Sequence, residues 1–128
     1  MTSAVSDQSF ATSGHRYAAL AALLGALAVL CGALGSHALA DLPPRAQELW
    51  QIANRYHFYH ALALLVWGLS GRGGWAARLW LAGLLLFSGS LYLYALAGWR
   101  PLAIVTPLGG LLWIFAWLWA AGALWRKA

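Results

Sequence analysis

The sequence predicts an all-α membrane protein, a four-helix transmembrane bundle. Composition is the first reason, because 62% of the 128 residues are hydrophobic and only 9% are charged, whereas soluble domains carry about 25% charged residues. A soluble domain of this size could not hide so much apolar side chain, since small domains bury only about two thirds of their surface. The second reason is that apolar residues gather into stretches near the roughly 20 residues that a helix needs to cross a bilayer.

The single cysteine and the distribution of charge exclude other classes of protein. Cys31 has no second cysteine with which to build a disulfide framework. The net charge is +5, but the Lys and Arg residues are scattered along the chain without a basic stripe, so we expect no nucleic-acid partner. The lipid bilayer is the partner that this composition predicts.

We expect one membrane domain, residues 16–128, preceded by a polar tail. The Ser, Thr, Asp and Gln content of residues 1–15 predicts that the tail is disordered. The expected spans are about residues 17–39, 47–70, 75–97 and 106–125. An alternative interpretation of the first span is a cleaved signal peptide ending at Ala38-Leu39-Ala40, although its apolar run is longer than such peptides carry.

The fourth span can begin at either of two prolines. Thr106 followed by Pro107 is typical of a helix N-cap with proline at the first helical position, and we place the start there. Pro101 could instead open the helix, in which case Pro107 would produce a kink.

The second span is too short in its apolar part to cross a bilayer. Residues 56–69 reach only about 21 Å, against a hydrocarbon core of about 30 Å. A crossing helix must therefore begin near Trp50, which brings Arg55, His57 and His60 to membrane depth. A charge at the bilayer centre costs about 3 kcal/mol, so other spans or a second copy should enclose this half of the helix. The alternative is that the long Arg55 side chain reaches the headgroups.

This length argument predicts a polar cluster between the first and second spans, near the outer leaflet. Its expected members are His37, Asn54, Arg55, Tyr59 and His60, with Ser88 or Ser90 reaching toward them. Ionisable groups inside a membrane mark candidate functional sites, and buried polar groups can also specify one arrangement of helices.

Small residues recur at three- and four-residue steps along the first span, a pattern that lets membrane helices pack closely. The packing glycines that we predict are Gly25, Gly32 and Gly35 on the first span, Gly89 on the third, and Gly109 and Gly110 on the fourth. Trp113 and Trp117 lie four residues apart in the fourth span, and we interpret them as lipid-facing or packing bulk.

The Lys and Arg residues also predict the orientation in the membrane. With four spans, both termini lie on one side, which carries Arg16, Arg72, Arg78, Arg126 and Lys127. The other side carries fewer basic residues, namely Arg45, Arg55 and Arg100. Because basic residues accumulate on the cytoplasmic side, we expect both termini to be cytoplasmic.

Catalysis and metal binding have little support in the sequence. His57 and His60 are three residues apart, but no acidic or cysteine ligand accompanies them, so we expect no metal and no cofactor. Neither Cys31 nor the serines of the third span have a base nearby in the sequence, so we expect no catalysis.

Four motifs resemble a known family. They are residues 32–39 (GALGSHAL), 55–63 (RYHFYHALA), 87–92 (FSGSLY) and 106–110 (TPLGG). The residues in these motifs, and the order of the motifs along the chain, resemble those of a family of small bacterial inner-membrane proteins, domain of unknown function 423. That family is itself similar to the animal transmembrane protein 256. The resemblance implies a four-span protein of the bacterial plasma membrane, and it supplies no reaction, substrate or cofactor.

The positions that this resemblance selects overlap the polar cluster. They are His37, Arg55, Tyr56, Tyr59, His60, Ser88, Ser90, Tyr92, Thr106 and Pro107. We expect a structural or accessory component of the inner membrane, without catalysis, that acts as a homodimer or in a larger membrane complex. The alternative is binding or transport of a small ligand, a proton or an ion through the cluster.

Overall fold

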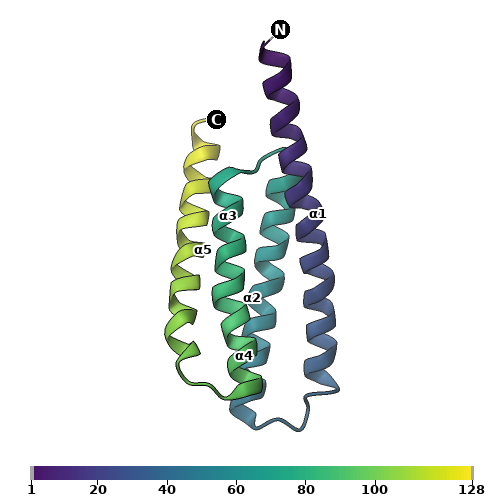
Figure 1. The fold of residues 1–128 in the computed structure, drawn as a ribbon, viewed down its shortest axis with the longest axis vertical. Coiled ribbons are helices and arrows are strands. Elements are labelled where there is room, and N and C mark those ends of the chain that lie inside the picture. Colours follow the sequence, from purple (N-terminus) through teal and green to yellow (C-terminus); the bar gives the residue numbers. More distant parts are fainter. Residues whose placement is uncertain (1, 128) are drawn as a thin grey trace.

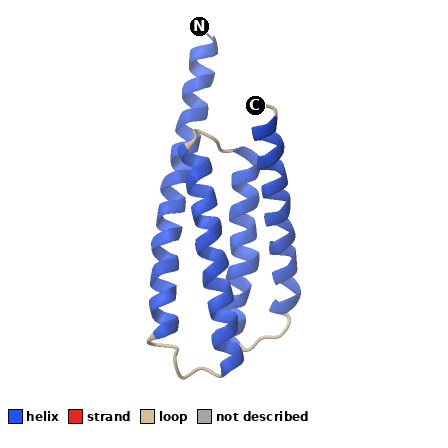
Figure 2. Cartoon of the chain, turned by 180° about the vertical axis from the view of Figure 1, so that it is seen from behind, coloured by secondary structure: helices blue, strands red, loops and turns tan. Residues whose placement is uncertain are grey.

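A computed structural model describes the backbone of residues 2–127 and the side chains of residues 13–127. All regular structure in this part of the chain is helical, which confirms the all-α prediction. The elements are α1 (Thr2–Ser36), α2 (Pro44–Leu69), α3 (Gly74–Gly83), the π-helical segment η1 (Leu84–Gly89), α4 (Ser90–Ala97) and α5 (Leu102–Trp125). Since α3, η1 and α4 form one continuous rod, four helical rods lie side by side (Figures 1 and 2).

The rods follow one another in chain order. α1 packs along α2, α2 packs along the α3–η1–α4 rod, and that rod packs along α5. Among the described residues, the backbones of α1 and α5 make no extensive contact. Successive rods run in opposite directions, so the beginning of α1 and the end of α5 lie at the same end of the molecule (Figure 1).

Three of the rods are long and apolar enough to cross a membrane, namely Ser13–Ser36, Gly74–Ala97 and Leu102–Trp125. α2 is the exception, because charged and polar side chains interrupt its first half. This is the rod whose apolar part is too short by the length argument, and it lies between α1 and the α3–η1–α4 rod.

The helix ends follow from proline and glycine. Pro44 begins α2 at a position where a missing N–H has no cost. Gly98 ends α4 with a φ of 65°, a left-handed conformation that glycine adopts easily.

α1 begins at Thr2, so the helix includes residues for which the sequence predicts a disordered tail.

α5 begins at Leu102, and the predicted start at Thr106 is wrong. Pro101 precedes the helix and Pro107 lies inside it, which is the alternative arrangement of the two prolines. The Thr106 hydroxyl does not cap the helix but donates to the Leu102 carbonyl one turn earlier, at 3.2 Å. Neighbouring helices and hydroxyl side chains allow membrane helices to tolerate such prolines.

Two apolar clusters fill the interior. The larger one joins all four rods and contains Ala21, Leu64, Trp67, Ala76, Ala77, Trp80, Leu84, Trp113, Ala116 and Ala120. The smaller one lies toward the loop between α1 and α2 and contains Leu49, Trp50, Ala53, Leu91 and Ala95. The polar side chains described next lie between and beside these clusters.

Candidate functional site

The Tyr92 hydroxyl joins two polar side chains of α2. It donates to Asn54 Oδ1 at 3.0 Å and lies 3.3 Å from His57 Nδ1. Because the hydroxyl has one proton and gives it to Asn54, it can only accept in the second contact, from Nδ1 of His57.

Trp50 connects this group to α1. Its indole nitrogen donates to the Cys31 carbonyl at 2.8 Å, and its ring meets the Tyr92 ring edge to face, with centroids 4.5 Å apart. A Cβ added at Gly35 would lie 2.6 Å from Trp50 Cδ1, so the glycine makes room for the indole. We call Trp50, Asn54, His57 and Tyr92 the Tyr92 network, and it ties α1, α2 and α4 together.

His60 lies in a separate aromatic group between α2 and α5. Its ring is stacked on Trp113, with centroids 3.6 Å apart and planes 1° from parallel. Nδ1 lies 2.8 Å from the Tyr56 carbonyl, while Nε2 accepts from the Trp117 indole at 3.4 Å. Both ring nitrogens are thus engaged within the protein, as expected for a neutral imidazole.

Ser88 within η1 and Ser90 directly after it have different surroundings. Ser90 Oγ lies 2.7 Å from Thr106 Oγ1 and 3.0 Å from the Phe87 carbonyl. Because Thr106 gives its only proton to Leu102, the Ser90 hydroxyl donates to Thr106 and links α4 to α5. Ser88 is fully buried, and its hydroxyl has no hydrogen-bond partner among the described residues. Nε2 of His57 is also buried and lacks a partner of standard geometry, although the ring lies close to the Leu24 backbone.

The predicted members of the polar cluster do not come together as one hydrogen-bonded group. His37, Arg55 and Tyr59 are exposed, whereas Asn54 belongs to the Tyr92 network and His60 to the aromatic group. The reason is that the α2 side chains among these project from different faces of the helix, one buried and one exposed. Positions 53, 57, 60 and 64 are buried and positions 55, 59, 62 and 66 are exposed, so the helix separates the imidazoles from the guanidinium.

Tyr92, His57 and Trp113 are not among the residues predicted for the polar cluster, yet each lies in one of the two groups just described. Trp113 is 4% exposed and donates to the Trp80 carbonyl at 3.1 Å, so it does not face lipid. The signal for Tyr92 was its spacing of four residues from Ser88, which places both side chains on one helical face. The corresponding signal for His57 was its spacing of three residues from Asn54.

The predicted packing glycines differ in their surroundings. An added Cβ would be 3.0 Å from Asn54 Nδ2 at Gly32 and 2.8 Å from the Leu86 carbonyl carbon at Gly109, so both positions, like Gly35, are tight. At Gly89 and Gly110 the nearest atoms lie at 3.9 Å and 3.6 Å, and at Gly25 nothing lies within 4 Å. An added Cβ at Gly25 would therefore meet no other described helix of the same chain within 4 Å.

The π-helical segment explains why Gly109 is tight. η1 widens the α3–η1–α4 rod next to α5, and the backbone of Leu86 and Phe87 approaches residue 109 directly. Only a residue without a side chain fits there. Single π turns often occur at functional sites, and this one contains Ser88.

Metal ligands do not gather in the described part of the chain. No group of three His, Cys, Asp or Glu side chains there could hold a metal ion. The carboxylate of Glu48 pairs with Arg45 at 2.7 Å on the surface. The buried polar side chains in this part of the chain are His57, His60, Ser88 and Ser90, and none is a carboxylate.

The family described as "Protein of unknown function (DUF423)" matches residues 31–110. The chain belongs to this family. The matched residues include the whole Tyr92 network, η1 and Gly109, whereas Trp113 and Trp117, which contact His60, lie beyond them.

Bacterial relatives of the DUF423 chain support a membrane location. A UPF0382 membrane protein of Staphylococcus epidermidis is 44% identical over 105 residues, which cover 77% of this chain and 86% of that protein. UPF0382 membrane protein YwdK of Bacillus subtilis is 40% identical, with 77% and 87% covered. A UPF0382 membrane protein of Haemophilus influenzae is 36% identical, with 81% and 89% covered. No solved structure shows a significant match. Because its relatives are membrane proteins and three of its helical rods are long and apolar enough to cross a bilayer, the chain is a transmembrane protein.

Proposed function

We propose that the protein is a structural or accessory component of the bacterial plasma membrane, without catalysis, whose polar interior fixes the packing of its helices. The observation that carries this proposal is the Tyr92 hydroxyl, which contacts both Asn54 and His57 across the interface of α2 and α4. His60 supports the same role, because both of its nitrogens are engaged by protein groups. Side chains occupied in this way hold helices together rather than carry a solute.

The proposal includes a four-span bundle in which α2 also crosses the membrane. α2 has a continuous buried face from Leu49 to Gly68, and α1 and the α3–η1–α4 rod flank it, so its polar groups need not all meet lipid. We assign residues 16–128 to the single membrane domain and place residues 1–15 outside the bilayer.

The same reasoning supports cytoplasmic termini. The end of the molecule that holds both termini (Figure 1) also carries Arg16, Arg72, Arg78, Arg126 and Lys127. The opposite end carries Arg45 and Arg100 together with Asp41 and Glu48. An excess of basic residues at one end favours the cytoplasmic side for that end.

Flux and stability measurements test the structural role together. The full-length protein in proteoliposomes should conduct no more protons than protein-free vesicles. Tyr92→Phe should destabilise the protein in detergent without changing this baseline. A proton flux that is present in the wild type and lost in His60→Ala, but retained in the exposed-site control His37→Ala, would overturn the structural proposal in favour of transport.

A second candidate function is the binding of a small polar ligand. The Ser88 hydroxyl supports it, because it is buried and lacks a hydrogen-bond partner among the described residues. Buried polar atoms are usually satisfied, and those that are not often contact a water or a ligand. Retention of a small molecule in native mass spectra of the wild type, and its loss in Ser88→Ala, would favour this function over the structural one.

A further inference from the structure

We propose a site for an anionic glycerophospholipid in the groove between α2 and α5, with one acyl chain in the groove and the phosphate at Arg72. The groove has a volume of about 550 Å³, within the range of about 300–1,000 Å³ that small-molecule sites occupy. It extends the proposed function, because neither helix packing nor an accessory role requires a bound lipid.

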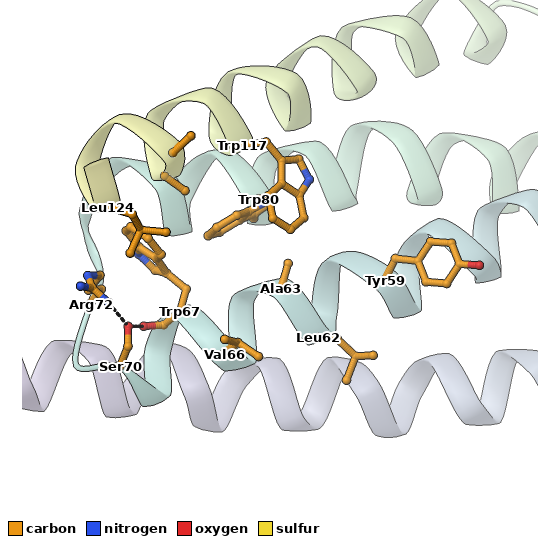
Figure 3. Close-up of a pocket in the computed structure, with 12 residues that line it drawn as sticks. Tyr59, Leu62, Ala63, Val66, Trp67, Ser70, Arg72, Trp80, Trp117 and Leu124 are labelled. Atoms are coloured by element: carbon orange, nitrogen blue, oxygen red, sulfur yellow. Dashed lines mark hydrogen bonds between the residues drawn. The ribbon is translucent and has the colours of Figure 1, made fainter. Parts of the chain in front are cut away.

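The groove exists because indole rings keep α2 and α5 apart. Trp80 of α3 meets Trp67 of α2 edge to face at 5.6 Å and Trp117 of α5 at 5.3 Å. In Figure 3 these rings lie between the ribbons of α2 and α5, while Leu62 and Val66 extend from α2 and Leu124 lies at one end. The walls are thus aliphatic and aromatic, a surface that suits an acyl chain.

The groove carries a cation at one end. Arg72 Nη1 donates to Ser70 Oγ at 2.9 Å, and its Cζ lies 5.3 Å from the centre of the Trp67 ring. These two contacts hold the guanidinium beside the groove, as Figure 3 shows. A guanidinium has five N–H donors, so donors remain for a phosphate.

The described side chains place no carboxylate beside this guanidinium. Among the described side chains, the carboxylates are Asp41 and Glu48, which lie at the opposite end of the molecule. Glu48 is paired with Arg45. Arg16, Arg126 and Lys127 add positive charge at the end where Arg72 lies, so the charge at this end complements an anionic headgroup.

The length of the groove fits one leaflet. From Tyr59 to Ser70 α2 rises about 16 Å at 1.5 Å per residue, close to half of a hydrocarbon core of about 30 Å. The cationic end coincides with the end of α2, where headgroups would lie. A lipid with its phosphate at Arg72 would therefore extend its chain along the groove toward Tyr59.

The test measures lipid binding to the full chain in detergent by native mass spectrometry. The probes are dioleoylphosphatidylglycerol, dioleoylphosphatidylcholine and glycerol 3-phosphate, which separate a lipid headgroup from a free phosphate. We expect the anionic lipid to bind more tightly than the zwitterionic one. Arg72→Gln should weaken the anionic lipid about fivefold, whereas the control Arg78→Gln, exposed at the same end, should not.

A second pair of variants tests the groove itself. Ala121→Phe fills it from an exposed position on α5, and Ala103→Phe adds the same bulk to an exposed position on that helix outside the groove. Only the first should lower binding. Equal retention of the two lipids, equal loss in Arg72→Gln and Arg78→Gln, or full binding of glycerol 3-phosphate would overturn the proposal. So would a change from dimer to monomer in Ala121→Phe without loss of lipid, because a second copy would then occupy the groove.

Discussion

Tyr92 on α4 donates a hydrogen bond to Asn54 on α2, at a distance of 3.0 Å between the hydroxyl and Oδ1. The two residues are 38 positions apart in the sequence, and the contact joins the helix that is too polar to qualify as a span by itself to one that is apolar. The same hydroxyl meets His57, so removing it affects two side chains at once. This relationship leads to the first prediction.

Tyr92→Phe should lower the free energy of unfolding by about 1–2 kcal/mol. The variant loses an interhelical hydrogen bond, which contributes about 0.6–1.7 kcal/mol in membranes. It also leaves Asn54 Oδ1 without the donor that it has in the wild type. Unfolding by sodium dodecyl sulfate, followed by circular dichroism, measures the change. Tyr59→Phe is the control, because that ring is 55% exposed, and it should change stability by less than about 0.5 kcal/mol. Equal effects of the two variants would contradict the role assigned to the network.

His60→Ala should destabilise the protein by about 1–3 kcal/mol. The variant removes the parallel contact with Trp113 and the acceptor of the Trp117 indole, and each such contact contributes about 0.5–1.5 kcal/mol. The same unfolding measurement applies. His37→Ala is the matched control, since His37 is exposed, and it should behave like the wild type. A His60→Ala protein as stable as the wild type would show that the stack contributes nothing.

The class of fold could be predicted from the sequence, whereas the faces of α2 could not. Composition alone indicates helices in lipid, and the short apolar part of residues 56–69 identifies α2 as the polar rod. Polar residues surround the first half of α2, however, so helical periodicity does not say which side is buried. The rods packed beside α2 decide that His57 and His60 point inward and Arg55 outward.

Two further features depend on contacts between distant segments. The sequence predicts Trp113 to be lipid-facing or packing bulk. In the structure its ring packs in the space left by Gly83. Only the packing of α3 against α5 brings Trp113 and Gly83 together. The π-helical turn at Leu84–Gly89 leaves no mark in residue types, because it changes the hydrogen-bond step rather than the hydrophobic pattern. Gly32 and Gly35 on α1 and Gly109 on α5 lie in tight helix contacts. Gly25, on α1 with the first two, does not.

The contrast between these glycines gives the third prediction. Gly109→Ala should destabilise the protein by about 1–3 kcal/mol, because the added carbon would press on the Leu86 and Phe87 backbone and overpacking of this size has that cost. Gly25→Ala has open space around it and should be neutral or stabilising by up to about 1 kcal/mol. Thermal unfolding in detergent compares the two. If Gly109→Ala were as stable as Gly25→Ala, the close approach of η1 to α5 would be refuted.

Arg55 gives the last prediction, which concerns association. Its guanidinium is exposed on the face shared by α1 and α2, beside Gly32 and Asn54, and it forms no ion pair with any described side chain. A charge in this position favours a protein partner that supplies an acceptor at membrane depth. In the accessory role that we propose, Arg55→Leu should therefore weaken association with that partner or with a second copy.

Light scattering of the purified protein, and quantification of stoichiometric partners that purify with it, measure this change. We expect association to weaken by about 30-fold, since truncating one member of a buried charged pair costs about 2 kcal/mol or more. The stability of the isolated chain should not fall, because Arg55 makes no ion pair within it. Arg78→Leu, an exposed basic residue near the end of the molecule, is the control and should leave association intact. A monomeric wild type without partners, or an Arg55→Leu protein that associates normally, would remove this support for an accessory role and leave the helix-packing function of the Tyr92 network as the proposal that stands.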